Sequence, residues 1–179
     1  MTLTAVVFGE AETQGSKRAF IPKGGRRPVL VEDNKDLKPW RSQLQAEMRE
    51  ALNGAELPFG RGSPVQVQLL VFVQRPAAHY GTGRNAGKLK ESAPAIPAGE
   101  RKDLDKIARA VGDAGTGIWW LDDHQISAWF ARRRYAEDGR IRTEVRARLD
   151  EVPEPRRTLS EAVEQARGGP APTPRVGFA

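Results

Sequence analysis

The chain has 179 residues, enough for one domain with a hydrophobic core, and its formal net charge is +6. It contains no cysteine, which excludes disulfides, thiolate zinc sites and a cysteine nucleophile. Because no run of 18 apolar residues occurs and no basic flank precedes the short apolar stretch at the N-terminus, we expect no membrane span, no secretory signal and a soluble cytoplasmic protein.

The first predicted elements are a strand, a basic loop and a helix. Residues 2 to 8 are rich in β-branched and apolar types and predict a strand. Residues 9 to 27 predict a long loop or a loose hairpin, followed by a short strand at residues 28 to 33. A helix is expected from about Pro39 to the stop signal Asn53-Gly54. Its apolar residues recur every four positions: Trp40, Leu44, Met48 and Leu52.

The middle of the chain predicts a strand and then an insertion. Between residues 63 and 76 apolar side chains alternate from Val65 to Val73, which is typical of a strand with one buried face. Residues 77 to 100 are rich in Gly, Ala, Pro and Lys, and they predict a mobile insertion.

A second helix and three strands are predicted after the insertion. The helix, about residues 104 to 114, has an apolar face, and an aromatic strand follows over residues 115 to 123. Two further strands, residues 125 to 137 and 140 to 149, flank Asp138-Gly139, which predicts a hairpin between them. On such strands one residue of each adjacent aromatic pair, Trp119-Trp120 and Trp129-Phe130, should be buried.

The domain is expected to end near residue 150. Residues 151 to 179 hold five prolines and little apolar content, so a disordered tail is predicted there. This tail carries four acidic and four basic residues, and the whole positive excess therefore lies in residues 1 to 150. A basic folded body favours a polyanion such as nucleic acid as partner.

Carboxylates gather around the second predicted helix. Asp103 and Asp105 would point roughly 200° apart if both were helical, but an extended Asp103 at the N-cap could turn back toward Asp105. With an acidic residue of the later Asp122-Asp123 pair, they would suit Mg²⁺ or Mn²⁺, which prefer oxygen ligands and make a bound water nucleophilic. His124 could position water, but on a strand it should point away from Asp123.

Ordinary structural roles explain the same spacing. Asp103 could be only an N-cap, Asp105 and Arg109 a surface ion pair, and Asp122 and Asp123 a turn. The spacing alone leaves both interpretations open.

The order of motifs DLDKIARAVGDAG, GIWW and LDDHQI resembles the RusA family of Holliday junction endodeoxyribonucleases. The resemblance implies an α+β, RusA-like resolvase fold over residues 1 to 150: a small mixed or antiparallel sheet with packed helices, in a two-fold homodimer. It places the metal ligands at Asp103, Asp105 and Asp123, with Asp122 as a helper or turn residue.

The family's functional lysine falls on Arg109. Arginine keeps the positive charge for phosphate but cannot act as a general acid, so electrostatic stabilisation would remain. Lys106 replaces the family's usual asparagine and lies close enough to substitute for that lysine.

Eight basic residues are predicted to contact DNA. Arg132 and Arg134 should share one face of a strand, opposite Arg133. The eight are Lys17, Arg18, Lys23, Arg26, Arg27, Lys102, Arg132 and Arg134.

The resemblance implies a Mg²⁺-dependent, structure-selective endodeoxyribonuclease. It would resolve four-way junctions by paired symmetric nicks in DNA recombination and repair, inside a bacterial cell or a phage-infected host. Two alternatives remain: a branched-DNA-binding protein without catalysis, and a metal-dependent nuclease for flaps or other structures.

Overall fold

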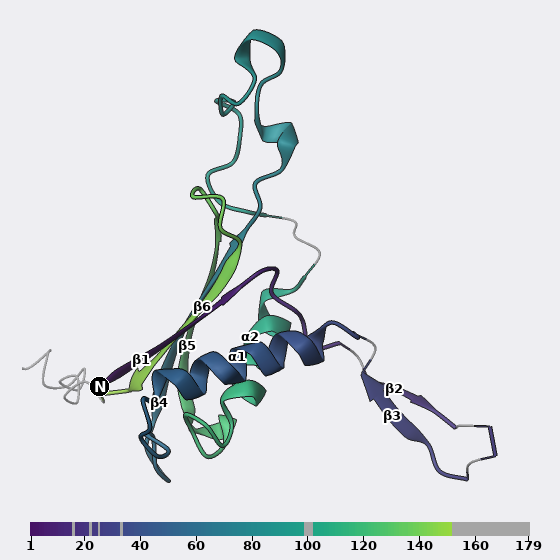
Figure 1. Cartoon of the computed structure of the whole chain (residues 1–179), viewed down its shortest axis with the longest axis vertical. Coiled ribbons are helices and arrows are strands. Elements are labelled where there is room, and N and C mark those ends of the chain that lie inside the picture. Colours follow the sequence, from purple (N-terminus) through teal and green to yellow (C-terminus); the bar gives the residue numbers. More distant parts are fainter. Residues whose placement is uncertain (16, 22, 25, 33, 99–101, 152–179) are drawn as a thin grey trace, which may run out of the picture.

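The computed structural model describes residues 1–151 except 16, 22, 25, 33 and 99–101 (Figure 1). Its centre is a four-stranded mixed sheet in the order β1-β6-β4-β5, and two α-helices pack on it. The predicted α+β class with a small mixed sheet is therefore confirmed. No helix in the described ranges is long and apolar enough to cross a membrane. The four strands are β1 (Thr2–Phe8), β4 (Val65–Val73), β5 (Ile126–Tyr135) and β6 (Arg142–Leu149).

The central strand is β4, which pairs parallel with β5 and antiparallel with β6. Leu69, for example, lies opposite Ala131 on one side and Val145 on the other. The alternation predicted for this strand is confirmed, because Val65, Val67, Leu69 and Val71 all point into the core and are buried. A strand with both edges paired leaves few backbone groups without a hydrogen bond, so it forms the rigid base of the domain.

The predicted hairpin between the last two strands is wrong. The turn forms, since Gly139 has a φ of 72° and its N–H donates to the carbonyl of Ala136 at 2.9 Å. However, β5 and β6 lie on opposite sides of β4 and do not pair with each other. A turn signal specifies that the chain reverses, whereas the pairing partner is decided by distant residues, here the apolar strand β4.

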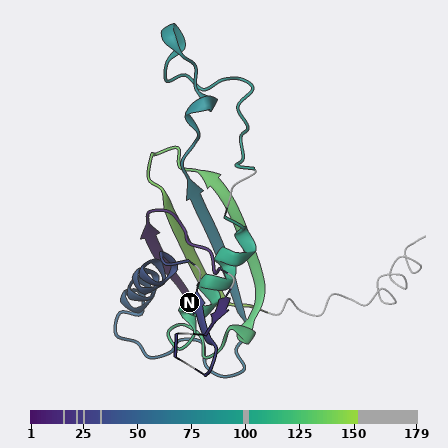
Figure 2. The same ribbon diagram turned by 90° about the vertical axis from the view of Figure 1, so that its right-hand side faces the viewer.

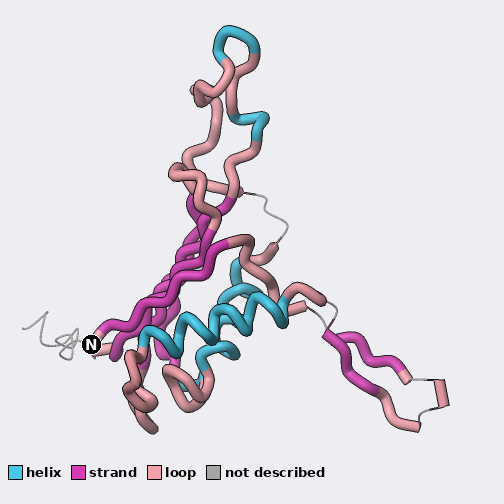
Figure 3. Tube along the Cα trace, in the orientation of Figure 1, coloured by secondary structure: helices cyan, strands magenta, loops and turns pink. Residues whose placement is uncertain are grey.

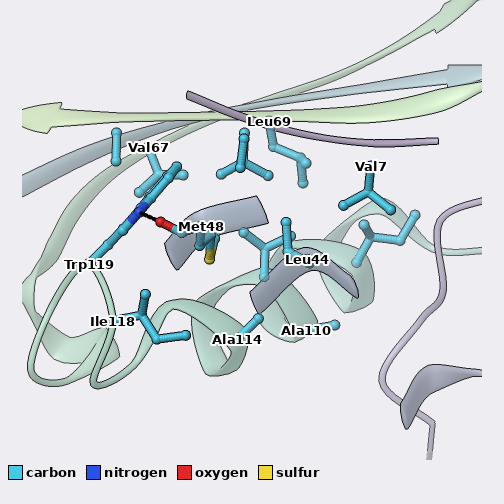
Figure 4. Packing of buried hydrophobic residues seen from close by; sticks show 14 of the residues in the cluster. Val7, Leu44, Met48, Val67, Leu69, Ala110, Ala114, Ile118 and Trp119 are labelled. Atoms are coloured by element: carbon cyan, nitrogen blue, oxygen red, sulfur yellow. Dashed lines mark hydrogen bonds between the residues drawn. The ribbon is translucent and has the colours of Figure 1, made fainter. Parts of the chain in front are cut away.

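Both helices, α1 (Leu37–Ala51) and α2 (Leu104–Gly115), cover the same face of the sheet (Figure 2). Between them and the sheet lies the core, which includes Leu44 and Met48 of α1 and Ala110 and Ala114 of α2 (Figure 4). The outer face of the sheet carries no helix in the described part of the chain. Figure 1 shows the same one-sided arrangement from the edge of the sheet.

The predicted aromatic strand is absent, because the chain between α2 and β5 forms a turn and then the 3-10 helix η3 (Asp123–Gln125). Trp119 and Trp120 are both fully buried, contrary to the expected alternation. A turn lets adjacent side chains point to the same side, and each indole N–H finds a backbone carbonyl: Trp119 donates to Met48 at 2.8 Å (Figure 4) and Trp120 to Gly112 at 3.1 Å. Trp129 and Phe130 of the edge strand β5 are both exposed, at 37% and 53%.

Two segments project from the domain (Figure 3). Strands β2 (Lys17–Phe20) and β3 (Val29–Glu32) form an antiparallel hairpin, in agreement with the loose hairpin that was predicted. Residues 77–98, here called the projecting arm, contain two 3-10 turns, η1 (Ala77–His79) and η2 (Gly83–Asn85). The mobility of this arm stays a prediction, and the predicted disordered tail lies outside the described residues from position 152 onward.

The base of the projecting arm is held by Arg75, a buried cation at the end of β4. Its guanidinium donates to the carbonyl of Pro94 at 3.0 Å, forms an ion pair with Glu137 and lies 3.9 Å from the centre of the Tyr135 ring. His79 packs edge-on against the same ring. These contacts tie both ends of the arm to the sheet.

Candidate functional site

Asp105, Arg109 and Asp123 line one open groove of about 560 Å³. On α2, Asp105, Ala108, Arg109 and Gly112 follow the spacing that places residues on one helix face. The opposite wall comes from η3 and β5, with Asp123, Ile126 and Trp129. The structure thus brings a carboxylate and a guanidinium of α2 next to a carboxylate of η3.

Gly112 marks the place where η3 and Trp129 approach α2. A Cβ atom built at Gly112 would lie 3.6 Å from the Cβ of Asp123 and 3.7 Å from the Trp129 ring, which is ordinary van der Waals contact, so the helix, η3 and β5 are already closely packed here. Gly112 lies about two turns beyond Asp105 on the same face. This glycine was not predicted as a site residue; a glycine inside an amphipathic helix was the only available signal.

Asp105 and Arg109 of this groove are not neutralised by a described neighbour, whereas Oδ1 of Asp123 is 3.4 Å from Nδ1 of His124. Among the described residues, Asp105 and Arg109 form no ion pair with each other, and none with any other side chain within 4.0 Å. The interpretation of Asp105 and Arg109 as an ordinary surface ion pair is therefore wrong. Their charges remain available for a cation and a phosphate.

Asp103 lies at the start of α2 but does not line the groove. It is the extended N-cap residue that was predicted, with φ −65° and ψ 133°, yet its side chain makes no cap hydrogen bond. Instead, its carboxylate is 2.6 Å from Nζ of Lys106. The hydrogen bond from Lys106, then the charges of Lys106 and Arg133, lower the pKa of Asp103. The same bond raises the pKa of Lys106.

Asp122 acts as the cap of η3. Its Oδ1 accepts from the backbone N–H of His124 at 2.9 Å, while Oε1 of Gln125 accepts from the N–H of Asp122 itself at 3.3 Å and from that of Leu121 at 2.8 Å. This reciprocal capping fixes the turn and points Asp123 into the groove. The backbone hydrogen bond from His124, together with the bond from its ring, lowers the pKa of Asp122.

His124 lies beside the two aspartates rather than pointing away from them. Its Nδ1 contacts the carboxylate of Asp122 and is 3.4 Å from Oδ1 of Asp123. The expectation for a strand fails here because η3 is a helical turn. The hydrogen bond to Asp122 raises the pKa of His124. One possible ligand atom from each of Asp122, Asp123 and His124 lies within 4.8 Å of the others, and all three are exposed.

The groove suits a hard divalent cation. Carboxylates on two walls of an open groove are the oxygen ligands that Mg²⁺ or Mn²⁺ prefers, and the guanidinium of Arg109 lines the same groove. A cation bound there would activate a water and offset charge on a phosphodiester.

The basic residues predicted for DNA fall in three places. Lys23, Arg26 and Arg27 are exposed in the loop between β2 and β3, whereas the side chains of Lys17 and Arg18 lie outside the described part of the structure. Lys102 precedes Asp103 in the chain, but it already forms ion pairs with two glutamates. Its Nζ is 2.7 Å from Oε1 of Glu12 and 3.2 Å from Oε2 of Glu10. Burial of Lys102 by itself lowers the pKa of this side chain. The hydrogen bonds to Glu12 and Glu10 have the larger combined effect, so the pKa of Lys102 is raised.

Arg132 and Arg134 lie across the sheet from the groove. They line a hollow of about 990 Å³ on the face without helices, together with Arg142, Arg146 and Arg148. Arg133 lines a different hollow on the helix side, so the predicted division of the three arginines is confirmed. Although the outer hollow is larger, the groove is the better candidate for catalysis, because it joins carboxylates from two elements to a cation and one of them, Asp105, has no ion-pair partner among the described residues.

The comparisons with known proteins agree with this arrangement. A family model described as endodeoxyribonuclease RusA matches residues 11–146 of the 179-residue chain, a range that contains α2, η3 and the whole groove. The comparison with curated proteins gives no match. The resemblance drawn from the sequence is confirmed, and the chain belongs to the RusA endodeoxyribonuclease family.

Proposed function

We propose that this protein is a Mg²⁺-dependent endodeoxyribonuclease that resolves Holliday junctions by paired symmetric nicks, in DNA recombination and repair. The observation that carries the proposal is the groove lined by Asp105, Arg109 and Asp123, in which Asp105 and Arg109 have no ion-pair partner within the described residues. Family membership supplies the substrate class. Such an enzyme would act in the cytoplasm of a bacterial cell or a phage-infected host.

In this proposal Asp105 and Asp123 would hold the cation, whose chemistry would be to make a bound water more acidic and to offset charge on the scissile phosphate. Mn²⁺ could replace Mg²⁺ at the same oxygen ligands. Asp103 completes the site when its carboxylate leaves Lys106, a rearrangement of one exposed side chain. Asp122 keeps η3 in place through its cap.

Arg109 contributes the positive charge that meets the scissile phosphate. An arginine side chain in this role stabilises charge and does not transfer a proton. Lys106, bound to Asp103, becomes free for a phosphate only when Asp103 turns to the metal.

A four-way junction is close to two-fold symmetric and needs nicks in two opposed strands. A homodimer with one groove per subunit is the simplest assembly that matches this symmetry.

The first test compares a synthetic four-way junction, a flap and a linear duplex, each with Mg²⁺ and with EDTA. We expect preferential cleavage of the junction at two symmetric positions, leaving 5′-phosphate and 3′-hydroxyl ends, and no cleavage in EDTA. Tight binding without cleavage in either condition would favour a non-catalytic junction-binding protein. Preferential cleavage of the flap would favour the other nuclease class.

A second test separates Arg109 from Lys106. We expect Arg109→Ala to lower the single-turnover cleavage rate about 10²-fold, because one charge aimed at the transition state is lost. Lys106→Ala should lower it less, since this lysine already has Asp103 as partner. Arg109→Lys should recover part of the rate.

The control for both variants is Arg49→Ala, which removes an exposed positive charge from the last turn of α1. Its cleavage rate should equal that of the wild type. An Arg109→Ala variant with full activity would remove Arg109 from the mechanism.

A further inference from the structure

Arg133 is the member of the arginine triplet that faces the helices. It lines a hollow of about 410 Å³ together with Lys102 and with Ile107 of α2. Ile107 and Asp105 point roughly 200° apart around α2, so this hollow and the catalytic groove lie on different sides of the start of the helix. Asp103 is the N-cap residue that precedes the helix and lines neither of the two.

The guanidinium of Arg133 has no side-chain partner among the described residues. Its Nη2 atom is buried and finds no hydrogen-bond acceptor among the described residues, and within those residues the side chain forms no ion pair. Removing a charged group from water without a compensating anion is costly. A half-buried guanidinium without an acceptor therefore favours the binding of an anion from outside the chain.

The other cations near Asp103 are already engaged. Lys102, in the same hollow, is held by Glu10 and Glu12, and Lys106 is held by Asp103. The charge of Arg133 helps to lower the pKa of Asp103, although the hydrogen bond from Lys106 is the larger cause of that shift. Of the cations on this side of α2 in the described structure, Arg133 is the one whose charge is not balanced.

We propose that Arg133 binds a backbone phosphate of the DNA strand next to the scissile phosphate. The strand would pass over the start of α2, with the scissile phosphate at Arg109 and a neighbouring phosphate at Arg133. A guanidinium suits this role because its fork of N–H donors matches two phosphate oxygens. The proposal rests on the proposed function for the cleavage site, and it adds a second phosphate position on the helix side of β5.

The test uses Arg133→Ala and Arg133→Gln, with Arg133→Lys as the variant that keeps the charge and Arg49→Ala as the control. Junction affinity is measured in EDTA at several salt concentrations, and single-turnover cleavage is measured in Mg²⁺. Loss of one phosphate contact should reduce the slope of log Kd against log salt concentration by about one. Arg133→Lys and Arg49→Ala should keep the wild-type slope.

A neutral methylphosphonate placed in turn at each phosphate beside the cleaved bond identifies the partner. At one position it should weaken wild-type binding about tenfold and leave binding by Arg133→Ala unchanged, because the contact is already lost. Equal weakening of both proteins at every position, or an unchanged salt slope in both Arg133→Ala and Arg133→Gln, would overturn the proposal. If the wild type binds but does not cut junctions, the proposed function fails while the binding arms still decide the role of Arg133.

Discussion

Replacing Asp105 by Asn should abolish junction cleavage, with a fall in the single-turnover rate of about 10³-fold or more, while junction binding persists. The carboxylate faces Asp123 across the groove and no described cation neutralises it. The amide keeps the shape but loses the charge that would hold a divalent cation. Binding should persist or tighten, because one negative charge leaves the surface that meets the phosphates.

The matched control is Asp113→Asn on the same helix. Asp113 is 3.3 Å from Nη2 of Arg41 and serves to join α2 to α1, away from the groove. Its cleavage rate should stay close to that of the wild type. Asp123→Asn should behave like Asp105→Asn, and a comparable loss in Asp103→Asn would support its movement from Lys106 to the metal.

Cleavage is measured on a labelled junction with enzyme in excess, and binding is measured by gel shift in EDTA. Equal cleavage rates for the wild type and Asp105→Asn would contradict the proposed metal site.

Replacing Trp120 by Ala should lower the free energy of unfolding by about 3–5 kcal/mol. Trp120 is fully buried, its indole N–H donates to the carbonyl of Gly112 at 3.1 Å, and a Cβ atom on Gly115 would overlap its ring. The cavity left by the indole would lie directly under the turn that leads to η3. For a domain of this size we expect the Tm to fall by roughly 10 °C.

Trp129→Ala provides the comparison, because Trp129 is 37% exposed and its truncation creates no closed cavity. This variant should lose no more than about 1 kcal/mol. Urea unfolding followed by circular dichroism measures both variants. Similar losses for Trp120→Ala and Trp129→Ala would contradict the packing described for Trp120.

The elements were largely predictable from the sequence because their signals are local. Alternation in β4 and the apolar stripe of α2 each describe one segment against one core. The order of the strands was not predictable in the same way. The Asp138-Gly139 turn is a true reversal, but whether β6 pairs with β5 or crosses to the far side of β4 depends on residues far along the chain.

Motif order indicated Asp103, Asp105, Asp123 and Arg109 as the site, and all of these except Asp103 line the groove. Its contacts were not predicted. The bond of Asp103 to Lys106 depends on side-chain rotamers, and the close approach at Gly112 depends on packing between η3 and α2. Strand alternation indicated that Arg133 lies opposite Arg132 and Arg134. It gave no indication that its guanidinium has no partner among the described residues.

The position of β4 in the sheet also has a consequence for synthesis on the ribosome. Both strands that pair with β4 follow it in the chain, after the projecting arm and α2. While these segments are still being made, the apolar side chains of β4 and both of its hydrogen-bonding edges have no partners in the sheet. An exposed strand of this kind is prone to aggregate, so the nascent chain is most vulnerable between the completion of β4 and the arrival of β6.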